Sequence, residues 1–227
     1  MANSNLIDSK GWQAMNRIGA LSNMYHILSD NWKEVLDEIN LIKKSKNSIL
    51  ELQNDTSLSR KIFNFLASCK SMVDFYRKAS QFYENTDFKT VLEVKHSEYF
   101  SKNELCVFIS DLRNCQLHSS TITTFMSKNM QIIYFIDDLL KYGKWNAKSK
   151  KYMAKYTDYI VIESVFEEYF LYIKEFYKWF YAEIIKFHKQ DFIETKSILN
   201  PNNPYEQRLI PIYQSVIVNK TVDLDKT

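Results

Sequence analysis

The chain has 227 residues, a formal net charge of +3, and 45 % hydrophobic and 15 % aromatic residues. This composition excludes a disordered chain, and the net charge is too small to indicate nucleic-acid binding by itself. Three widely spaced cysteines argue against a disulfide framework, and no window approaches 18 uncharged apolar residues. We therefore expect a cytoplasmic protein without a membrane span.

The first 190 residues contain few helix breakers, because all three prolines lie at positions 201, 204 and 211. Apolar residues recur at three- and four-residue steps over 8–28, 31–53 and 57–84, which predicts three helices. Polar residues at 29–31 are expected to end the first helix and cap the second. Residues 88–100 are ambiguous between a short helix and an irregular stretch.

Two further patterns follow in the middle of the chain. Ser101 and Glu104 match a capping box, in which each side chain bonds a backbone N–H, and this predicts a helix over 102–118. β-Branched and aromatic runs around a polar turn then predict a small β-hairpin at about 120–136. The fold class that we expect is all-α, a helical bundle with this hairpin as an insertion.

The stretch 157–190 has the clearest helical periodicity and is rich in aromatic residues. Its apolar series is expected to lie in the core or in a dimer interface, and comprises Phe166, Phe170, Ile173, Tyr177, Phe180 and Ile184. We expect one helical domain over 1–190 and a loosely ordered tail over 191–227, in which 209–218 is a candidate strand.

The predicted helix 102–118 carries the sequence Leu112-Arg113-Asn114-Cys115-Gln116-Leu117-His118. In its pattern of Arg, a polar residue, three variable residues and His, it resembles the HEPN superfamily, the helical-bundle domains of many prokaryotic toxins, abortive-infection proteins and CRISPR-associated ribonucleases. The resemblance covers about 101–189. It implies an HEPN-like bundle and a homodimer in which two motifs face each other across a two-fold axis.

The spacing within the motif sets a geometric condition. Asn114 and His118 are four residues apart and share a helical face, whereas Arg113 and His118 are five apart, which is roughly 140° of rotation. A long Arg side chain, a frayed helix end or a second motif across a dimer each meets this condition, and the resemblance implies the dimer.

The activity that the resemblance implies is metal-independent cleavage of RNA by its own 2′-hydroxyl. His118 is the candidate for proton transfer, Arg113 for binding the phosphate, and Asn114 for orienting either. No metal or other cofactor is expected, because the four histidines at 26, 96, 118 and 188 are scattered and neither paired cysteines nor a Gly-rich phosphate loop occurs. A cysteine protease centred on Cys115 is not favoured, because no organised partner is evident.

Lysines and aromatic residues alternate over 141–156, which suits a phosphate backbone and stacked bases. The candidate RNA-binding residues here are Lys144, Lys148, Lys150 and Lys151. The alternative is a solvated loop and helix face whose aromatic residues anchor it to the core. Glu104 has likewise two interpretations, capping and catalysis.

The leading hypothesis is thus an HEPN-type endoribonuclease, acting as a toxin or in antiviral defence, with RNA as substrate and an antitoxin or regulator as a candidate partner. The alternative is a non-catalytic RNA-binding or protein-interaction module of the same fold. In that case Arg113 pairs with a neighbour such as Asp111, and His118 interacts with the helix dipole.

Overall fold

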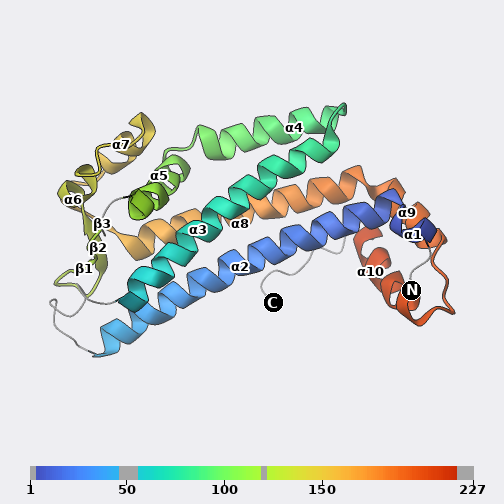
Figure 1. The fold of residues 1–227 in the computed structure, drawn as a ribbon, viewed down its shortest axis with the longest axis horizontal. Helices are drawn as coiled ribbons and strands as arrows, with labels where there is room; N and C mark the ends of the chain where they lie inside the picture. Colours follow the sequence, from blue (N-terminus) through green and yellow to red (C-terminus); the bar gives the residue numbers. More distant parts are fainter. Residues whose placement is uncertain (1–3, 46–55, 119–121, 219–227) are drawn as a thin grey trace. The chain divides into compact units, whose positions relative to one another are not determined.

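The structure is a computed structural model that describes residues 4–45, 56–118 and 122–218. It is mostly helical with a small three-stranded antiparallel sheet (Figure 1), so the expectation of a helical protein with a hairpin is confirmed at this level. The α-helices in the described ranges are α1 (Ser4–Ile7), α2 (Lys10–Ser45), α3 (Thr56–Ser80), α4 (Asp87–His96), α5 (Glu104–His118), α6 (Ile136–Leu140), α7 (Ala147–Met153), α8 (Ile162–Phe187), α9 (Lys189–Ser197) and α10 (Pro204–Ile217).

The described residues group into two compact units. The larger unit comprises residues 24–174, and the smaller comprises the residues up to 23 together with those from 175 onward. The unit boundaries therefore fall within α2 and α8, whereas the domain boundary expected at residue 190 falls within α9. Every candidate site residue belongs to the larger unit.

Helix α2 is one helix where the sequence predicted two. The polar residues at 29–31 do not end it, because the Asn31 side chain donates a hydrogen bond of 2.8 Å to the Ile27 carbonyl of the same helix. An Asn that bonds four residues back is accommodated inside a helix and caps nothing. The residues predicted to complete the second helix, 46–53, lie outside the described ranges.

Aromatic side chains from α2, α3 and α8 form the core of the larger unit. The Phe65 ring lies 5.4 Å from that of Trp32 and 5.0 Å from that of Phe166, and all three side chains are buried. At the rim of this core, Lys43 of α2 pairs with Glu163 of α8 at 2.8 Å. Burial of three large rings supplies far more stabilisation than this partly exposed ion pair.

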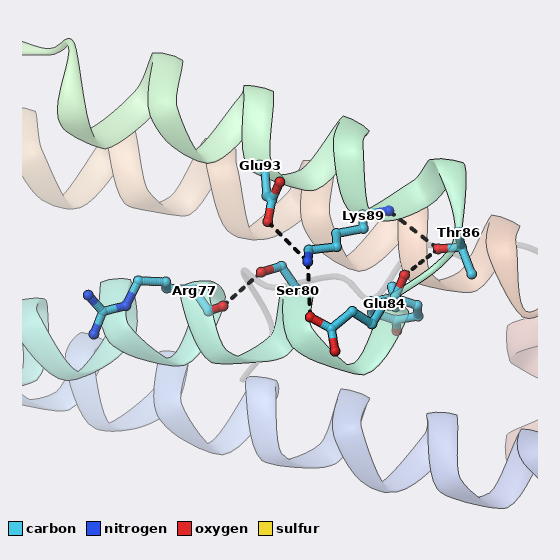
Figure 2. A network of polar contacts seen from close by, with 7 residues as sticks. Arg77, Ser80, Glu84, Thr86, Lys89 and Glu93 are labelled. Atoms are coloured by element: carbon cyan, nitrogen blue, oxygen red, sulfur yellow. Dashed lines mark hydrogen bonds and ion pairs between the residues drawn. The ribbon is translucent and has the colours of Figure 1, made fainter.

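A polar network holds the corner between α3 and α4 (Figure 2). The Thr86 hydroxyl accepts the Lys89 backbone N–H as the α4 cap, and the Lys89 ammonium lies 3.1 Å from Glu84 and 3.7 Å from Glu93. The hydrogen bond that Lys89 donates to Glu84 raises the pKa of Lys89. The Arg77 guanidinium points away from this network (Figure 2). A short 3₁₀ turn, Gln81–Tyr83, precedes the corner, and a π-helical segment, Ser97–Ser101, follows α4, so the ambiguous stretch 88–100 is helical.

The sheet has strand order β1 (Phe125–Met126), β2 (Ile132–Phe135) and β3 (Tyr159–Val161). β1 and β2 form an antiparallel hairpin inside the predicted range of 120–136, of which 120 and 121 lie outside the described ranges. β3 was not predicted. Its residues were assigned to the long helix, which begins only at Ile162 because Tyr159–Val161 pair with β2 instead.

The smaller unit contains the segment expected to be a loose tail, and within 191–218 this segment includes the end of α9 and the whole of α10. Asn203 caps α10 by accepting the Tyr205 N–H at 3.0 Å. Pro204 occupies the first helical position, where a backbone N–H would have no partner within the helix, so its absence in proline costs nothing. The candidate strand at 209–218 is therefore part of a helix up to Ile217. Residues 219–227 of the predicted tail lie outside the described ranges.

The aromatic series of α8 is core in both units. Phe166 and Ile173 are buried in the larger unit, and Tyr177, Phe180 and Ile184 are buried in the smaller one, where the Tyr177 hydroxyl lies 3.0 Å from that of Ser22. Among the described residues, no helix combines the length and low charge that crossing a bilayer requires.

Candidate functional site

Helix α5 carries the Arg113–His118 motif and begins at Glu104, two residues later than predicted. Asn103 is its cap, because the Asn103 side chain accepts the Cys106 N–H at 3.1 Å. Ser101 instead closes the preceding π-helical segment, so the predicted capping box is wrong. The cause is local competition, since Asn is at least as good a cap as Ser and stands directly before Glu104.

Glu104 is therefore free for another role, and it pairs with α7. Its carboxylate oxygens lie 2.6 Å from the Lys151 ammonium and 2.9 Å from that of Lys155. The hydrogen bond from Lys151, with that from Lys155 next, lowers the pKa of Glu104. The interpretation of Glu104 as a capping residue is replaced by an ionic link between two helices.

The apolar side of α5 fixes the motif in place. Leu105, Phe108, Ile109, Leu112 and Cys115 are all buried. Burial makes Cys115 part of the core. The polar motif side chains at 113, 114 and 116 are half-buried, and His118 at the last position of the helix is exposed.

Arg113 and Asn114 contact one another directly. Arg113 Nη1 donates to Asn114 Oδ1 at 3.3 Å, which draws the guanidinium toward the helical face that Asn114 shares with His118. Arg113 Nε is buried and has no hydrogen-bond partner in the described part of the chain. An N–H of a guanidinium that is buried without an acceptor is costly, and a ligand oxygen is one group that can satisfy it.

Asp111 is not the partner of Arg113. Asp111 Oδ2 accepts the Asn146 N–H at 2.8 Å and the Ser149 hydroxyl at 2.7 Å, both at the start of α7. Among the described residues, Arg113 thus contacts its neighbour Asn114, and no ion pair joins it to Asp111. Asp111 fastens α7 to the motif helix.

Gln116 is a polar contact that the sequence did not single out. Its Nε2 donates to the hydroxyl of buried Tyr134 in β2 at 3.0 Å, and its Oε1 is buried with no partner among the described residues. Burial raises the pKa of Tyr134, so the hydroxyl stays neutral and can both accept and donate. In the motif pattern this position is variable, so nothing in the sequence marks it.

The predicted RNA-binding lysines divide into two pairs. Lys148 donates to the Ser101 carbonyl and Lys151 pairs with Glu104, so both attach α7 to the α5 region. Lys144 and Lys150 are exposed, and in the described ranges neither makes an ion pair. The structure therefore leaves Lys144 and Lys150 as the more available cations beside the motif helix.

Two of the aromatic residues of this region, Trp145 and Tyr152, face inward. Trp145 and Tyr152 are buried, and their rings lie 5.6 and 5.0 Å from the ring of Phe108 in α5. The Trp145 indole donates to the Leu139 carbonyl at 2.6 Å. These two rings anchor α7 and its preceding loop to the core, as the alternative interpretation of this stretch has it, and they are not exposed for stacking with bases.

Across residues 4–45, 56–118 and 122–218, no three His, Cys, Asp or Glu side chains gather in an arrangement that could hold a metal ion. Comparison of the chain with family models, with curated proteins and with solved structures gave no match. The site is thus interpreted from its own geometry.

Proposed function

We propose that the chain is a metal-independent, HEPN-type endoribonuclease that uses Arg113, Asn114 and His118. The observation that carries the proposal is the environment of Arg113, whose guanidinium donates to Asn114 while its buried Nε–H has no acceptor among the residues that the structure describes. Guanidinium groups bind phosphates through paired N–H donors, and a phosphodiester oxygen supplies an acceptor that the described residues do not.

In the proposed reaction the 2′-hydroxyl of RNA attacks the adjacent phosphorus, and the bond to the 5′-oxygen of the next nucleotide breaks. The products are a 2′,3′-cyclic phosphate and a 5′-hydroxyl. Histidine exchanges protons near neutral pH, so His118 suits removal of the 2′-hydroxyl proton or protonation of the leaving 5′-oxygen. Arg113 stabilises the extra negative charge of the pentacovalent transition state.

A homodimer supplies two copies of this set. The two proton transfers of the reaction then belong to two His118 side chains, and two Arg113 side chains surround one phosphodiester. The contact between Arg113 and Asn114 also supports the set within one chain, because it brings the guanidinium toward the face of His118. A role as a toxin or in antiviral defence, restrained by an antitoxin or regulator, is part of the same proposal.

The test is incubation of the purified protein with mixed RNAs in a chelator, followed by end-group analysis. We expect cleavage that leaves cyclic phosphate and 5′-hydroxyl ends, and a loss of at least about 100-fold in rate for His118→Ala and for Arg113→Ala. His26→Ala and Arg60→Ala are matched controls, since both residues lie on other helices of the larger unit. Circular dichroism confirms that each variant is folded.

A wild-type protein that cleaves no RNA across pH, salt and RNA type contradicts the nuclease. The remaining candidate is then a non-catalytic module, and one observation favours it: Lys148 and Lys151 are used inside the protein. RNA binding without turnover predicts an affinity that falls with salt and is weakened by Lys144→Ala and Lys150→Ala. An interaction module predicts neither effect.

A further inference from the structure

A separate pocket lies in the larger unit between α3, the end of α4 and α5. Its volume is about 280 Å³, near the lower end of the range for small-molecule sites. Its wall includes the buried apolar side chains Leu66, Cys69, Phe100, Cys106, Ile109 and Tyr169. The pocket residues do not include Arg113, Asn114 or His118, so this site is distinct from the proposed nuclease site.

The α3 wall of the pocket carries an excess of positive charge. Lys70 Nζ and Arg77 Nη2 lie 3.1 and 3.2 Å from the same oxygen, Asp74 Oδ1, so one carboxylate is shared by two cations. All three side chains line the pocket, and both cations are partly exposed. One of the two positive charges is therefore available to an anionic group of a ligand.

The other walls offer acceptors. Asp111 of α5 adds a negative charge to the lining. His96, at the end of α4, has a pKa lowered by burial, against the opposing effect of its hydrogen bond to the Val73 backbone, and Arg77 and Lys70 lower it further. The imidazole is therefore neutral near pH 7. Its one N–H proton is on the nitrogen that donates to the Val73 backbone carbonyl. Its Nε2 is buried, has no partner within the described ranges, and is left as an acceptor.

These features match one class of small molecule. We propose that the pocket binds a free α-amino acid with an apolar side chain. The carboxylate pairs with Lys70 and Arg77, the ammonium donates to His96 Nε2 and Asp111, and the side chain occupies the apolar interior. A simple anion leaves the acceptors unsatisfied and a simple amine leaves the surplus positive charge of the α3 wall without a counter-charge, so the zwitterion fits the lining better than either.

The experiment is calorimetric titration of the full chain, without RNA, with L-leucine, L-methionine and L-phenylalanine. Two analogues of leucine isolate its charges: 4-methylpentanoate lacks the ammonium, and 3-methylbutylamine lacks the carboxylate. We expect at least one amino acid to bind below about 1 mM and each analogue of leucine to bind about tenfold more weakly than leucine itself.

Variants place the binding in this pocket. Arg77→Gln and Lys70→Gln are expected to weaken amino-acid binding by about tenfold, because each removes a charged donor to the carboxylate. Lys78→Gln is the matched control, since Lys78 is exposed on the same helix and does not line the pocket. His96→Leu is expected to weaken the binding of leucine but not that of 4-methylpentanoate, because only leucine has an ammonium that donates to His96.

Two results overturn the proposal. One is the absence of binding by all three amino acids up to about 10 mM. The other is amino-acid binding that is unchanged in Arg77→Gln, Lys70→Gln and His96→Leu, because the amino acid then binds at a different site. Neither result bears on the nuclease proposal, since no RNA is present and the motif residues are intact.

Discussion

At Gln116 and Tyr134 a single hydrogen bond ties the motif helix to the sheet. Tyr134→Phe removes the hydroxyl and leaves the buried amide of Gln116 without its acceptor, while the ring still fills the core. We expect a loss of about 1 kcal/mol in the free energy of unfolding, measured by urea denaturation. Tyr159→Phe is the control, because that side chain is exposed, and an equal loss there contradicts the assignment.

The residues of the motif were predictable from the sequence, but their surroundings were not. Arg113, Asn114 and His118 follow from a short pattern on a helix. The burial of Arg113 Nε away from any acceptor in the described ranges, and the bond between Gln116 and Tyr134, arise from side chains that are close only after folding. The pattern also gave no indication that Asp111 bonds α7, since Asn146 and Ser149 lie more than thirty residues away in sequence.

Among the elements, α7 depends on Asp111 for its attachment to α5. Asp111→Ala leaves the Asn146 N–H and the Ser149 hydroxyl without their charged acceptor, so we expect a loss of about 1–3 kcal/mol in the free energy of unfolding. Asp158→Ala is the matched control at an exposed position and is expected to change stability by less than about 0.5 kcal/mol. Chemical denaturation of both variants checks the difference.

Two glycines of α2 make a second test at this scale. A Cβ at Gly11 meets Thr195 Oγ1 and, at 2.5 Å, the Asp191 carbonyl oxygen, whereas a Cβ at Gly19 meets nothing within 4 Å. We expect Gly11→Ala to destabilise by about 1–3 kcal/mol, because the backbone of α9 must move. Gly19→Ala is expected to stabilise by about 0.5–1 kcal/mol through helix propensity. Thermal unfolding of the pair measures both signs, and a stable Gly11→Ala contradicts the close packing.

Helical periodicity predicted the long helices with an apolar face. It failed where a polar residue could either cap a helix or be accommodated inside one. The α3 and α8 regions were predicted because their buried faces repeat at helical spacing. Asn31 and Asn203 are the same residue type in opposite roles, one bonded inside a helix and the other capping one. β3 has three residues beside a long helix, and only its pairing with β2 makes it a strand.

For the whole molecule, two histidines make stability depend on pH, half-buried His96 in the larger unit and buried His188 in the smaller one. Burial is the main cause that lowers the pKa of His96, with Arg77 and Lys70 adding to it and the Val73 backbone and Asp74 opposing. Burial likewise lowers the pKa of His188, with Arg17 and Lys10 adding to it and Asp191, 2.7 Å away, opposing. Both side chains fold in the neutral form near pH 7.

The sign of the pH dependence follows from proton binding. Below the ordinary histidine pKa of about 6.5 the unfolded chain takes up protons that the folded chain does not, so the free energy of unfolding falls as the pH falls. The free energy of unfolding, measured by urea denaturation between about pH 8 and pH 5, should therefore show a plateau above about pH 7 and a decline below it, with the uptake of at most about one proton per histidine.

His96→Gln and His188→Gln should each make the decline shallower, because the substituted side chain does not titrate. Carboxylates also titrate near the acid end, but they are common to all three proteins, so the differences isolate the histidines. If a variant and the wild type decline with equal slope, that histidine does not contribute to the pH dependence. For His96, this result would also contradict the neutral acceptor on which the proposed amino-acid binding rests.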